Sequence, residues 1–340
     1  MQNNDTLFLC TPTPLVYPSL HIGEFSKIES TQSNEFNEIH VNKNEKLITT
    51  GDFNNFHIYI IITHSKFSIL PNSIIIDTNG FSATIELLDI KKQIEINFNF
   101  PKEFLILDWD KPVEITPTSY TQNEILDGFI FQQNNKEIKL VFDLHFITHY
   151  STNFLDFKIP LTIKYIGIAE KENKEHEKRT ALERLGKGHE KLQVILAKLQ
   201  KTPNLNCSIC LLRFKEDELD PILNFSNTIK TIEASLISFF RTDEYNDHRL
   251  YFPNKSNLKR TKSLEYIIHS KEILHIITFL TPPKNCSFFS EYTINNNISK
   301  NIDNQQNEQI NYLFKMNEDF EYAIHINMET LCCDAWNFQP

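Results

Sequence analysis

The sequence predicts a mixed α/β protein of the α+β class, in which an α/β core lies between two strand-rich regions. Residues 1–139 consist of short β-rich runs broken by turn residues, a pattern typical of a sandwich-like domain. Residues 140–255 mix strand-like and helical segments, and residues 256–340 return to strand-like runs. We therefore expect three units: an N-terminal β-rich domain, an α/β core and a C-terminal strand-rich extension.

The first unit contains six runs rich in β-branched and aromatic residues, which favour strands. Turn pairs such as Pro71-Asn72 and Asn79-Gly80 separate some of them. The predicted strands are His57–His64, Phe67–Leu70, Ser73–Asp77, Phe81–Leu88, Gln93–Phe100 and Phe104–Leu107.

In the core and the extension, the period of the apolar residues distinguishes helices from strands. The core is expected to contain strands at Leu140–Thr148, Ile163–Ala169 and Cys207–Phe214, a helical stretch at Glu170–Lys201, and a helix at Thr228–Arg241. The extension is expected to contain strands at Tyr266–His269, Ile273–Leu280, Ile310–Lys315 and Glu321–Asn327.

Membrane and secreted classes are disfavoured by the apolar pattern. No apolar run approaches the roughly 18 residues of a membrane span, and the longest candidate, His57–His64, has the length of a strand. The N-terminal segment Met1–Cys10 lacks the basic region and the long apolar stretch of a signal peptide. We expect a cytoplasmic protein without membrane contact.

The Cys207-Ser-Ile-Cys210 motif has the spacing of some metal and redox sites, but it has no second cysteine pair at zinc spacing. It also falls in a predicted strand, where residues three apart point to opposite faces. This favours two cysteines in the core over a metal or redox site.

The charge is unevenly distributed. The chain has a net charge of −10, yet residues 160–260 contain 18 Lys and Arg against 14 Asp and Glu, a balance of +4. The rest of the chain therefore has a balance of −14. A positively charged middle segment flanked by acidic regions suits a module that binds phosphates.

Five residues in the core have side chains suited to phosphate chemistry. Glu233 lies on the apolar stripe of its predicted helix, and an inward carboxylate needs a partner, either a divalent cation or an internal Arg or N–H group. Arg184 could hold phosphate oxygens. His189 could exchange a proton near neutral pH or cap the helix that follows it. Tyr165 could position or deprotonate water, and Asn246 could brace the site by hydrogen bonds.

The ordered series Tyr165, Gly167, Arg184, His189, Glu233 and Asn246 resembles the GIY-YIG nuclease superfamily over about residues 140–255. The matching pieces are a strand ending in Tyr-Ile-Gly, a helix with an Arg and a His, and a helix with a Glu followed by an Asn. The resemblance implies hydrolysis of phosphodiester bonds with one Mg²⁺ or Mn²⁺ ion held by Glu233. It also implies that Arg184 stabilises the developing charge.

The first strand of this pattern departs from the family. We match it to Asp143–Ile147, which puts His145 where the family has its first tyrosine. We expect the strand Leu140–Thr148 to pair beside Ile163–Ala169, so that His145 lies near Tyr165. A ring nitrogen of His145 would then replace the phenol in proton transfer.

The sequence thus predicts a metal-dependent endonuclease that acts on DNA, with RNA as an alternative substrate. Bacterial defence against foreign DNA is the setting suggested by restriction enzymes on this fold. Two other functions compete with this prediction. One is a protein that binds nucleic acid without cutting it. The other is a regulatory protein whose acidic outer regions bind a protein partner or a second copy of the chain.

Overall fold

The computed structural model describes residues 5–17, 29–32, 37–41, 45–49, 56–78, 80–100, 110–120, 124–152, 157–169, 181, 185, 189–214, 219, 221–242, 244–246, 252–253, 259–296 and 322–337. Within these ranges the protein combines α-helices with β-sheets and is richer in strands, in agreement with the predicted mixture. None of its described helices is long and apolar enough to cross a membrane.

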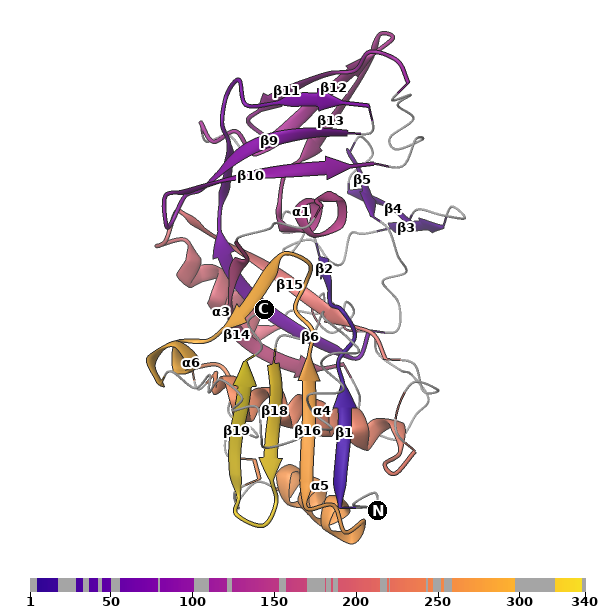
Figure 1. Cartoon of the computed structure of the whole chain (residues 1–340), viewed down its shortest axis with the longest axis vertical. Coiled ribbons are helices and arrows are strands. Elements are labelled where there is room, and N and C mark those ends of the chain that lie inside the picture. Colours follow the sequence, from indigo (N-terminus) through magenta and orange to yellow (C-terminus); the bar gives the residue numbers. More distant parts are fainter. Residues whose placement is uncertain are drawn as a thin grey trace.

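A five-stranded sheet in the order β17-β14-β6-β15-β2 occupies the middle of the molecule (Figure 1). Its neighbours are antiparallel except β14 and β17, which are parallel. The sheet crosses the boundaries predicted at residues 139 and 255, because its strands come from all three predicted units. They are β2 (Leu15–Tyr17), β6 (Ile58–Ser65), β14 (Ile159–Ile168), β15 (Leu205–Leu212) and β17 (Cys286–Phe289).

Strand β6 is the centre of this sheet, and all eight of its residues are buried. Its side chains alternate between two faces. Tyr59 and Ile61 pack with the helix α3 (Glu190–Leu199), and we call this side the α3 face. Ile58 and Ile60 point to the other side, which packs with the helix α4 (Phe225–Phe240) and which we call the α4 face. A continuous apolar run is what a strand covered on both faces requires.

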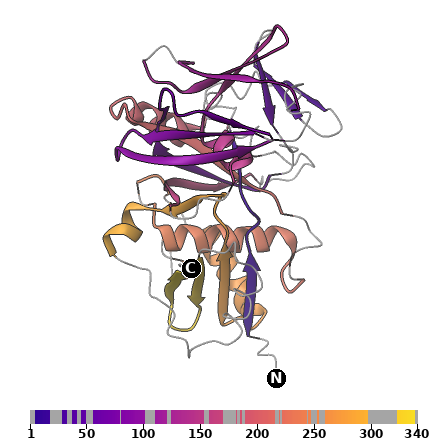
Figure 2. The same cartoon turned by 45° about the horizontal axis from the view of Figure 1, so that its top comes forward.

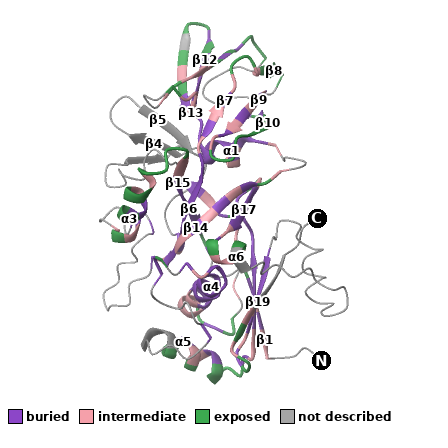
Figure 3. Cartoon of the chain, turned by 90° about the vertical axis from the view of Figure 1, so that its left-hand side faces the viewer, coloured by how far each residue is buried: buried purple, intermediate pink, exposed green. Residues whose placement is uncertain are grey.

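Helix α4 lies between the central sheet and a second sheet (Figure 2). This position buries nearly the whole helix (Figure 3). The second sheet has the order β1-β16-β18-β19, and β1 pairs with β16 in parallel. Its strands and the neighbouring helices are β1 (Thr6–Cys10), β16 (His275–Leu280), β18 (Tyr322–Asn327), β19 (Cys332–Asn337), α5 (Lys259–Ser270) and α6 (Glu291–Asn296).

The chain between β6 and β14 forms a separate β-rich tier above the central sheet in Figure 1. Its core is a cluster of phenylalanines with ring centroids 4.9–5.9 Å apart in neighbouring pairs, among them Phe81, Phe98, Phe129 and Phe142. The elements of this tier are β7 (Phe67–Ile69), β8 (Ile75–Asp77), β9 (Gly80–Leu87), β10 (Lys92–Asn99), β11 (Glu114–Thr118), β12 (Gly128–Gln133), β13 (Lys136–Val141) and α1 (Leu144–Tyr150). A further antiparallel sheet precedes β6 and consists of β3 (Glu29–Gln32), β4 (Asn37–Val41) and β5 (Glu45–Thr49).

Most of the predicted elements that fall in the described ranges are confirmed, and two predicted strands are wrong. Tyr266–His269 belongs to the helix α5, and Leu140–Thr148 is divided between β13 and the helix α1. The predicted strands Phe104–Leu107 and Ile310–Lys315, and most of the predicted helical stretch before α3, lie outside the described residues.

The prediction for the two cysteines of the C-x-x-C motif is confirmed. Cys207 and Cys210 are both buried on β15. Cys207 packs on the α3 face, whereas Cys210 packs on the α4 face. Burial raises the pKa of the Cys207 thiol to about 12. The two side chains are separated by the sheet and belong to the core.

Candidate active site

Two tyrosines from neighbouring strands lie together on the α3 face of the central sheet. Tyr59 on β6 pairs with Gly167 on β14, and Tyr165 on β14 pairs with Ile61. The two tyrosines are thus diagonal neighbours across the strand pair, a relation that brings long side chains into contact. Their ring centroids are 5.9 Å apart.

Gly167 provides the space that the two rings occupy. A Cβ atom at this position would lie 2.6 Å from the Tyr59 hydroxyl oxygen and 2.7 Å from a ring carbon of Tyr165. Aromatic rings are rigid, so they could avoid such a Cβ only by moving away from the strand. The glycine of the Tyr-Ile-Gly segment is therefore needed for the close approach of side chains to the backbone.

His189 joins the two tyrosines from the start of α3. Its Nε2 atom lies 2.9 Å from the hydroxyl oxygen of Tyr59, and its ring centroid lies 5.1 Å from that of Tyr165. The other ring nitrogen, Nδ1, accepts a hydrogen bond of 3.3 Å from the backbone N–H of Leu192. His189 is therefore the N-cap of α3 as well as a neighbour of both phenols.

The cap determines the tautomer of the neutral imidazole. Because Nδ1 accepts the backbone N–H, it carries the lone pair, and the proton is on Nε2. Nε2 then donates to the Tyr59 oxygen. A hydrogen bond donated to a phenol oxygen favours the phenolate form.

Asn246 holds the strand that bears Tyr165. Its side-chain oxygen accepts from the N–H of Ile166 at 3.1 Å, and its side-chain nitrogen donates to the carbonyl of Ile166 at 2.8 Å. Strand β17 pairs only with residues 159–162 of β14, so Asn246 takes the place of a neighbouring strand beside Ile166. Thr242 donates to the same oxygen of Asn246 at 2.5 Å. Asn246 thus braces the backbone of β14 next to Tyr165, and its part in an active site stays a prediction.

Glu233 is buried on α4, with 8% of its surface exposed, as expected from its place on the apolar stripe. Helix α4 packs against β14, the strand of Tyr165. Its apolar residues belong to the core of the α4 face, whereas the tyrosines lie on the α3 face. The role of Glu233 as metal ligand stays a prediction. Arg184 lies outside the described residues.

The predicted placement of His145 is wrong. Strand β6, not the segment around His145, pairs with β14. His145 lies in the helix α1, where Asp143 caps the first turn by accepting from the N–H of Phe146. The ring of His145 is buried, and its Nδ1 atom lies 2.6 Å from the carbonyl oxygen of Val16, to which it donates. His145 is thus a core residue that holds α1 to β2.

Two buried histidines are expected to make the protein sensitive to acid. Burial lowers the pKa of His145 to about 4, and it lowers the pKa of His64 on β6 to about 4 as well. The ring of His149 lies 4.6 Å from that of His145, and the carboxylates of Asp143 and Asp89 act on His64 in the opposite direction. An unfolded histidine has a pKa of about 6.5, so the unfolded chain binds protons that the folded chain does not.

The free energy of unfolding should therefore fall as the pH decreases from about 6.5 to about 4, by roughly 3 kcal/mol for each of the two groups. His145→Gln keeps a donor for Val16 but does not titrate. In urea unfolding, it should reduce the loss of stability between pH 7.5 and pH 5 by about 2 kcal/mol. His269→Gln, on the exposed side of α5, is the matched control. An undiminished loss in His145→Gln would contradict a neutral buried imidazole.

Tyr59 is the site residue that the sequence reasoning missed. The segment His57-Ile58-Tyr59 differs from Gly-Ile-Tyr only at its first residue, and this was the available signal. The long chain between Tyr59 and Tyr165 concealed the pairing of β6 with β14.

The described residues contain no group of three or more His, Cys, Asp or Glu side chains that could hold a metal ion. Comparisons of the chain with protein-family models, with curated proteins and with solved structures found no match. The residues of this chain alone therefore carry the functional proposal.

Proposed function

We propose that the protein is a divalent-metal-dependent endonuclease of the GIY-YIG type that hydrolyses phosphodiester bonds in DNA. The observation that carries the proposal is the hydrogen bond between Tyr59 and His189 beside the ring of Tyr165. Hydrolysis requires a group that takes a proton from the attacking water. Two phenols and an imidazole in mutual contact are suited to this task.

The position of Tyr59 strengthens the resemblance on which the proposal draws. With His57-Ile58-Tyr59 as the first segment, both tyrosines of the family pattern are present, and they lie on adjacent antiparallel strands. The only change in that first segment is His57 in place of glycine. With this match, His145 is not needed as a replacement for the first tyrosine of the pattern.

In the proposed reaction, Tyr59 handles the proton of the attacking water and His189 supports it. The Nε2–H of His189 stabilises negative charge on the Tyr59 oxygen. The phenol of Tyr59 would first release its proton to solvent, and the resulting phenolate would then accept a proton from the attacking water. Tyr165 lies against both rings and positions the water. Asn246 keeps the backbone of β14 in place beneath Tyr165. Arg184 is proposed to hold the phosphate oxygens.

Glu233 is the residue proposed to hold the metal ion. A buried carboxylate is a hard oxygen ligand of the kind that Mg²⁺ and Mn²⁺ accept, and Mg²⁺ commonly takes its remaining ligands from water and substrate phosphate. The proposed site has a single protein ligand, because the described residues contain no group of three or more His, Cys, Asp or Glu side chains that could hold a metal ion. When bound, the metal would neutralise the charge that develops on the phosphate.

The first test is the cleavage of supercoiled plasmid DNA by the purified protein. We expect nicking or linearisation with Mg²⁺ or Mn²⁺ and none with EDTA, measured on agarose gels over a range of salt concentrations. Equal loss of DNA with and without EDTA would contradict the metal requirement. Intact DNA and RNA under all conditions, together with measurable binding, would favour the protein that binds nucleic acid without cutting it.

A further inference from the structure

A pocket of about 450 Å³ opens beside the tyrosine cluster, between β14, the turn after α4, and α6. Its volume lies in the range of small-molecule sites. Tyr245 lines the pocket and also belongs to the apolar cluster of the α3 face that contains Tyr59. The polar and aromatic residues of the lining include Lys164, Arg241, Glu244, Tyr245, Glu291 and Tyr292.

Lys164 enters the pocket because of an irregularity in β14. Ile163 pairs with Ile62 of β6, while Tyr165 pairs with Ile61, so Lys164 is an extra residue in the strand pair. A bulge of this kind redirects a side chain, and bulges are frequent next to active sites. The ammonium group of Lys164 is therefore carried by the residue directly before Tyr165.

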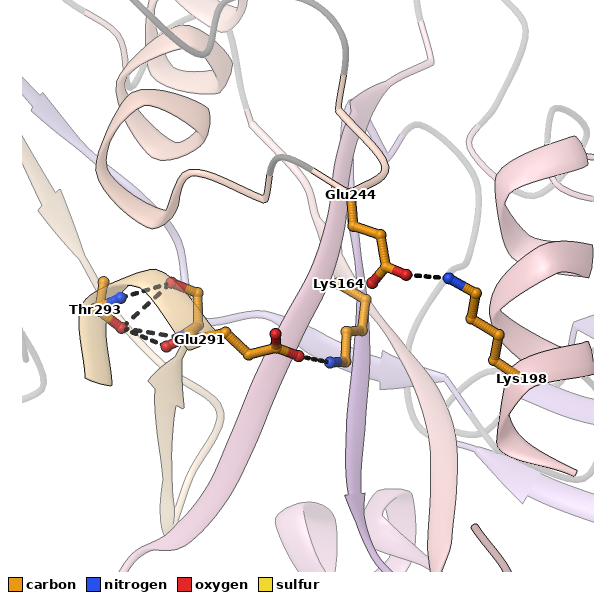
Figure 4. Close-up of polar contacts among 6 residues, drawn as sticks. Lys164, Lys198, Glu244, Glu291 and Thr293 are labelled. Atoms are coloured by element: carbon orange, nitrogen blue, oxygen red, sulfur yellow. Dashed lines mark hydrogen bonds and ion pairs between the residues drawn. The ribbon is translucent and has the colours of Figure 1, made fainter. Parts of the chain in front are cut away.

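Both glutamates of the pocket lining form ion pairs with lysines (Figure 4). Lys164 pairs with Glu291 at 2.6 Å, and Lys198 of α3 pairs with Glu244. The pair with Glu291 is asymmetric, because the side chain of Lys164 is 22% exposed whereas that of Glu291 is 74% exposed. An ion pair with such an exposed member contributes little stability, and Glu291 can turn into solvent at small cost. A phosphate can then take its place on Lys164.

The pocket lining also includes a guanidinium group next to an aromatic ring. Arg241 follows α4 in a left-handed conformation with φ 41°, and its guanidinium group lies 4.6 Å from the ring centroid of Tyr292 on α6. Guanidinium planes and tyrosine rings are the surfaces on which unstacked nucleobases pack in many nucleic-acid complexes. The carboxylates of Glu244 and Glu291 can accept hydrogen bonds from the amino groups of a base.

We propose that this pocket binds one unstacked nucleotide of the strand that is cut, with its phosphate on Lys164 and its base on the Arg241–Tyr292 surface. The proposal rests on the proposed nuclease function and specifies its substrate. A base that is paired in a duplex must leave the stack before it can enter a pocket. Nucleic acid with an unpaired nucleotide therefore binds more tightly than a continuous duplex.

The test is fluorescence anisotropy with the Glu233→Gln protein, which is expected not to cut, and labelled oligonucleotides of one sequence in single-stranded and duplex form. Lys164→Gln should weaken single-strand binding about fivefold to tenfold and reduce the salt slope of log K by about one, whereas Lys164→Arg should preserve both. Tyr292→Ala should weaken binding about tenfold. Glu291→Gln should strengthen it.

Matched controls lie outside the pocket. Lys139→Gln and Glu137→Gln remove the charges of another exposed ion pair, and Tyr266→Ala removes a tyrosine that is 76% exposed on α5. Pocket variants that bind like these controls, or a duplex that binds as tightly as the single strand, would overturn the proposal.

Cleavage assays on proteins that retain Glu233 separate this proposal from the nuclease proposal. Cleavage with an unchanged KM in Lys164→Gln and Tyr292→Ala would overturn the pocket and leave the nuclease standing. If nucleic-acid binding depends on the pocket residues but the protein never cleaves its substrate, the pocket proposal would be supported and the nuclease proposal overturned.

Discussion

Replacing Tyr59 with Phe is expected to lower kcat for DNA cleavage by roughly 10²–10⁴-fold, the usual contribution of a group that transfers a proton. The ring of Tyr59 is fully buried and would remain in the variant, so the packing over Gly167 should persist. The hydrogen bond to His189 would be lost, at a cost of about 1 kcal/mol in stability. Steady-state cleavage rates and thermal unfolding measure the two effects, with Tyr266→Phe on α5 as control.

His189→Asn separates the two roles of the histidine. Asparagine is among the best N-cap residues, so α3 should remain capped, but the variant lacks the ring nitrogen that faces Tyr59. We expect a stable protein with strongly reduced cleavage. If both Tyr59→Phe and His189→Asn cleaved DNA at the unaltered rate, the hydrogen bond would serve only to attach α3 to the sheet.

Glu233→Gln is expected to reduce turnover by two orders of magnitude or more, because it removes the proposed metal ligand while keeping the volume of the side chain. Affinity for DNA should stay the same or increase, since a negative charge is lost from the proposed metal site. Arg184→Ala should also lower turnover by orders of magnitude. Cleavage rates at several Mg²⁺ concentrations, together with binding in EDTA, distinguish these effects.

The alternative role of Glu233 is an internal pair within the core. In that case Glu233→Gln would lose stability, because the partner group would be left buried without its counter-charge. Its cleavage rate per folded molecule would stay unchanged. Thermal unfolding measured beside the kinetics therefore separates a metal ligand from a structural carboxylate.

The sequence was informative where local pattern and tertiary position agree. The run His57–His64 predicts a strand, and β6 at Ile58–Ser65 is the central strand of its sheet. The alternation of a strand predicts that Cys207 and Cys210 point apart, and they lie on opposite faces. The apolar stripe of α4 predicts the burial of Glu233.

Two failures arose because residues that favour strands occur in helices held by tertiary contacts. In α5, Leu264 and Ile268 are four residues apart and buried, while Tyr266 is exposed. A helical period is difficult to distinguish from a strand pattern in so short an apolar run. In α1, the capping bond of Asp143 marks a helix start that the aromatic residues concealed. The secondary structure of such short segments depends on the elements that pack against them.

The candidate site could be predicted only in part because it is assembled from distant segments. The site residues from Tyr165 to Asn246 occur along the chain in the order of the family pattern, so they can be recognised in the sequence. Tyr59 comes from a strand that precedes the phenylalanine-rich tier, and it meets His189 across 130 residues of chain. No local pattern reports a partner at that distance, so His145 was matched in its place.

The same separation affects the nascent protein. A ribosome that adds 5–20 residues per second needs roughly 7–26 s to pass from Tyr59 to His189. The hairpins of the intervening tier have local contacts and can form in that interval, since hairpins close within microseconds. The pair of Tyr59 and His189 cannot form until α3 has left the ribosome. If the chain is a nuclease, it is harmless to nearby DNA and RNA throughout this part of its own synthesis.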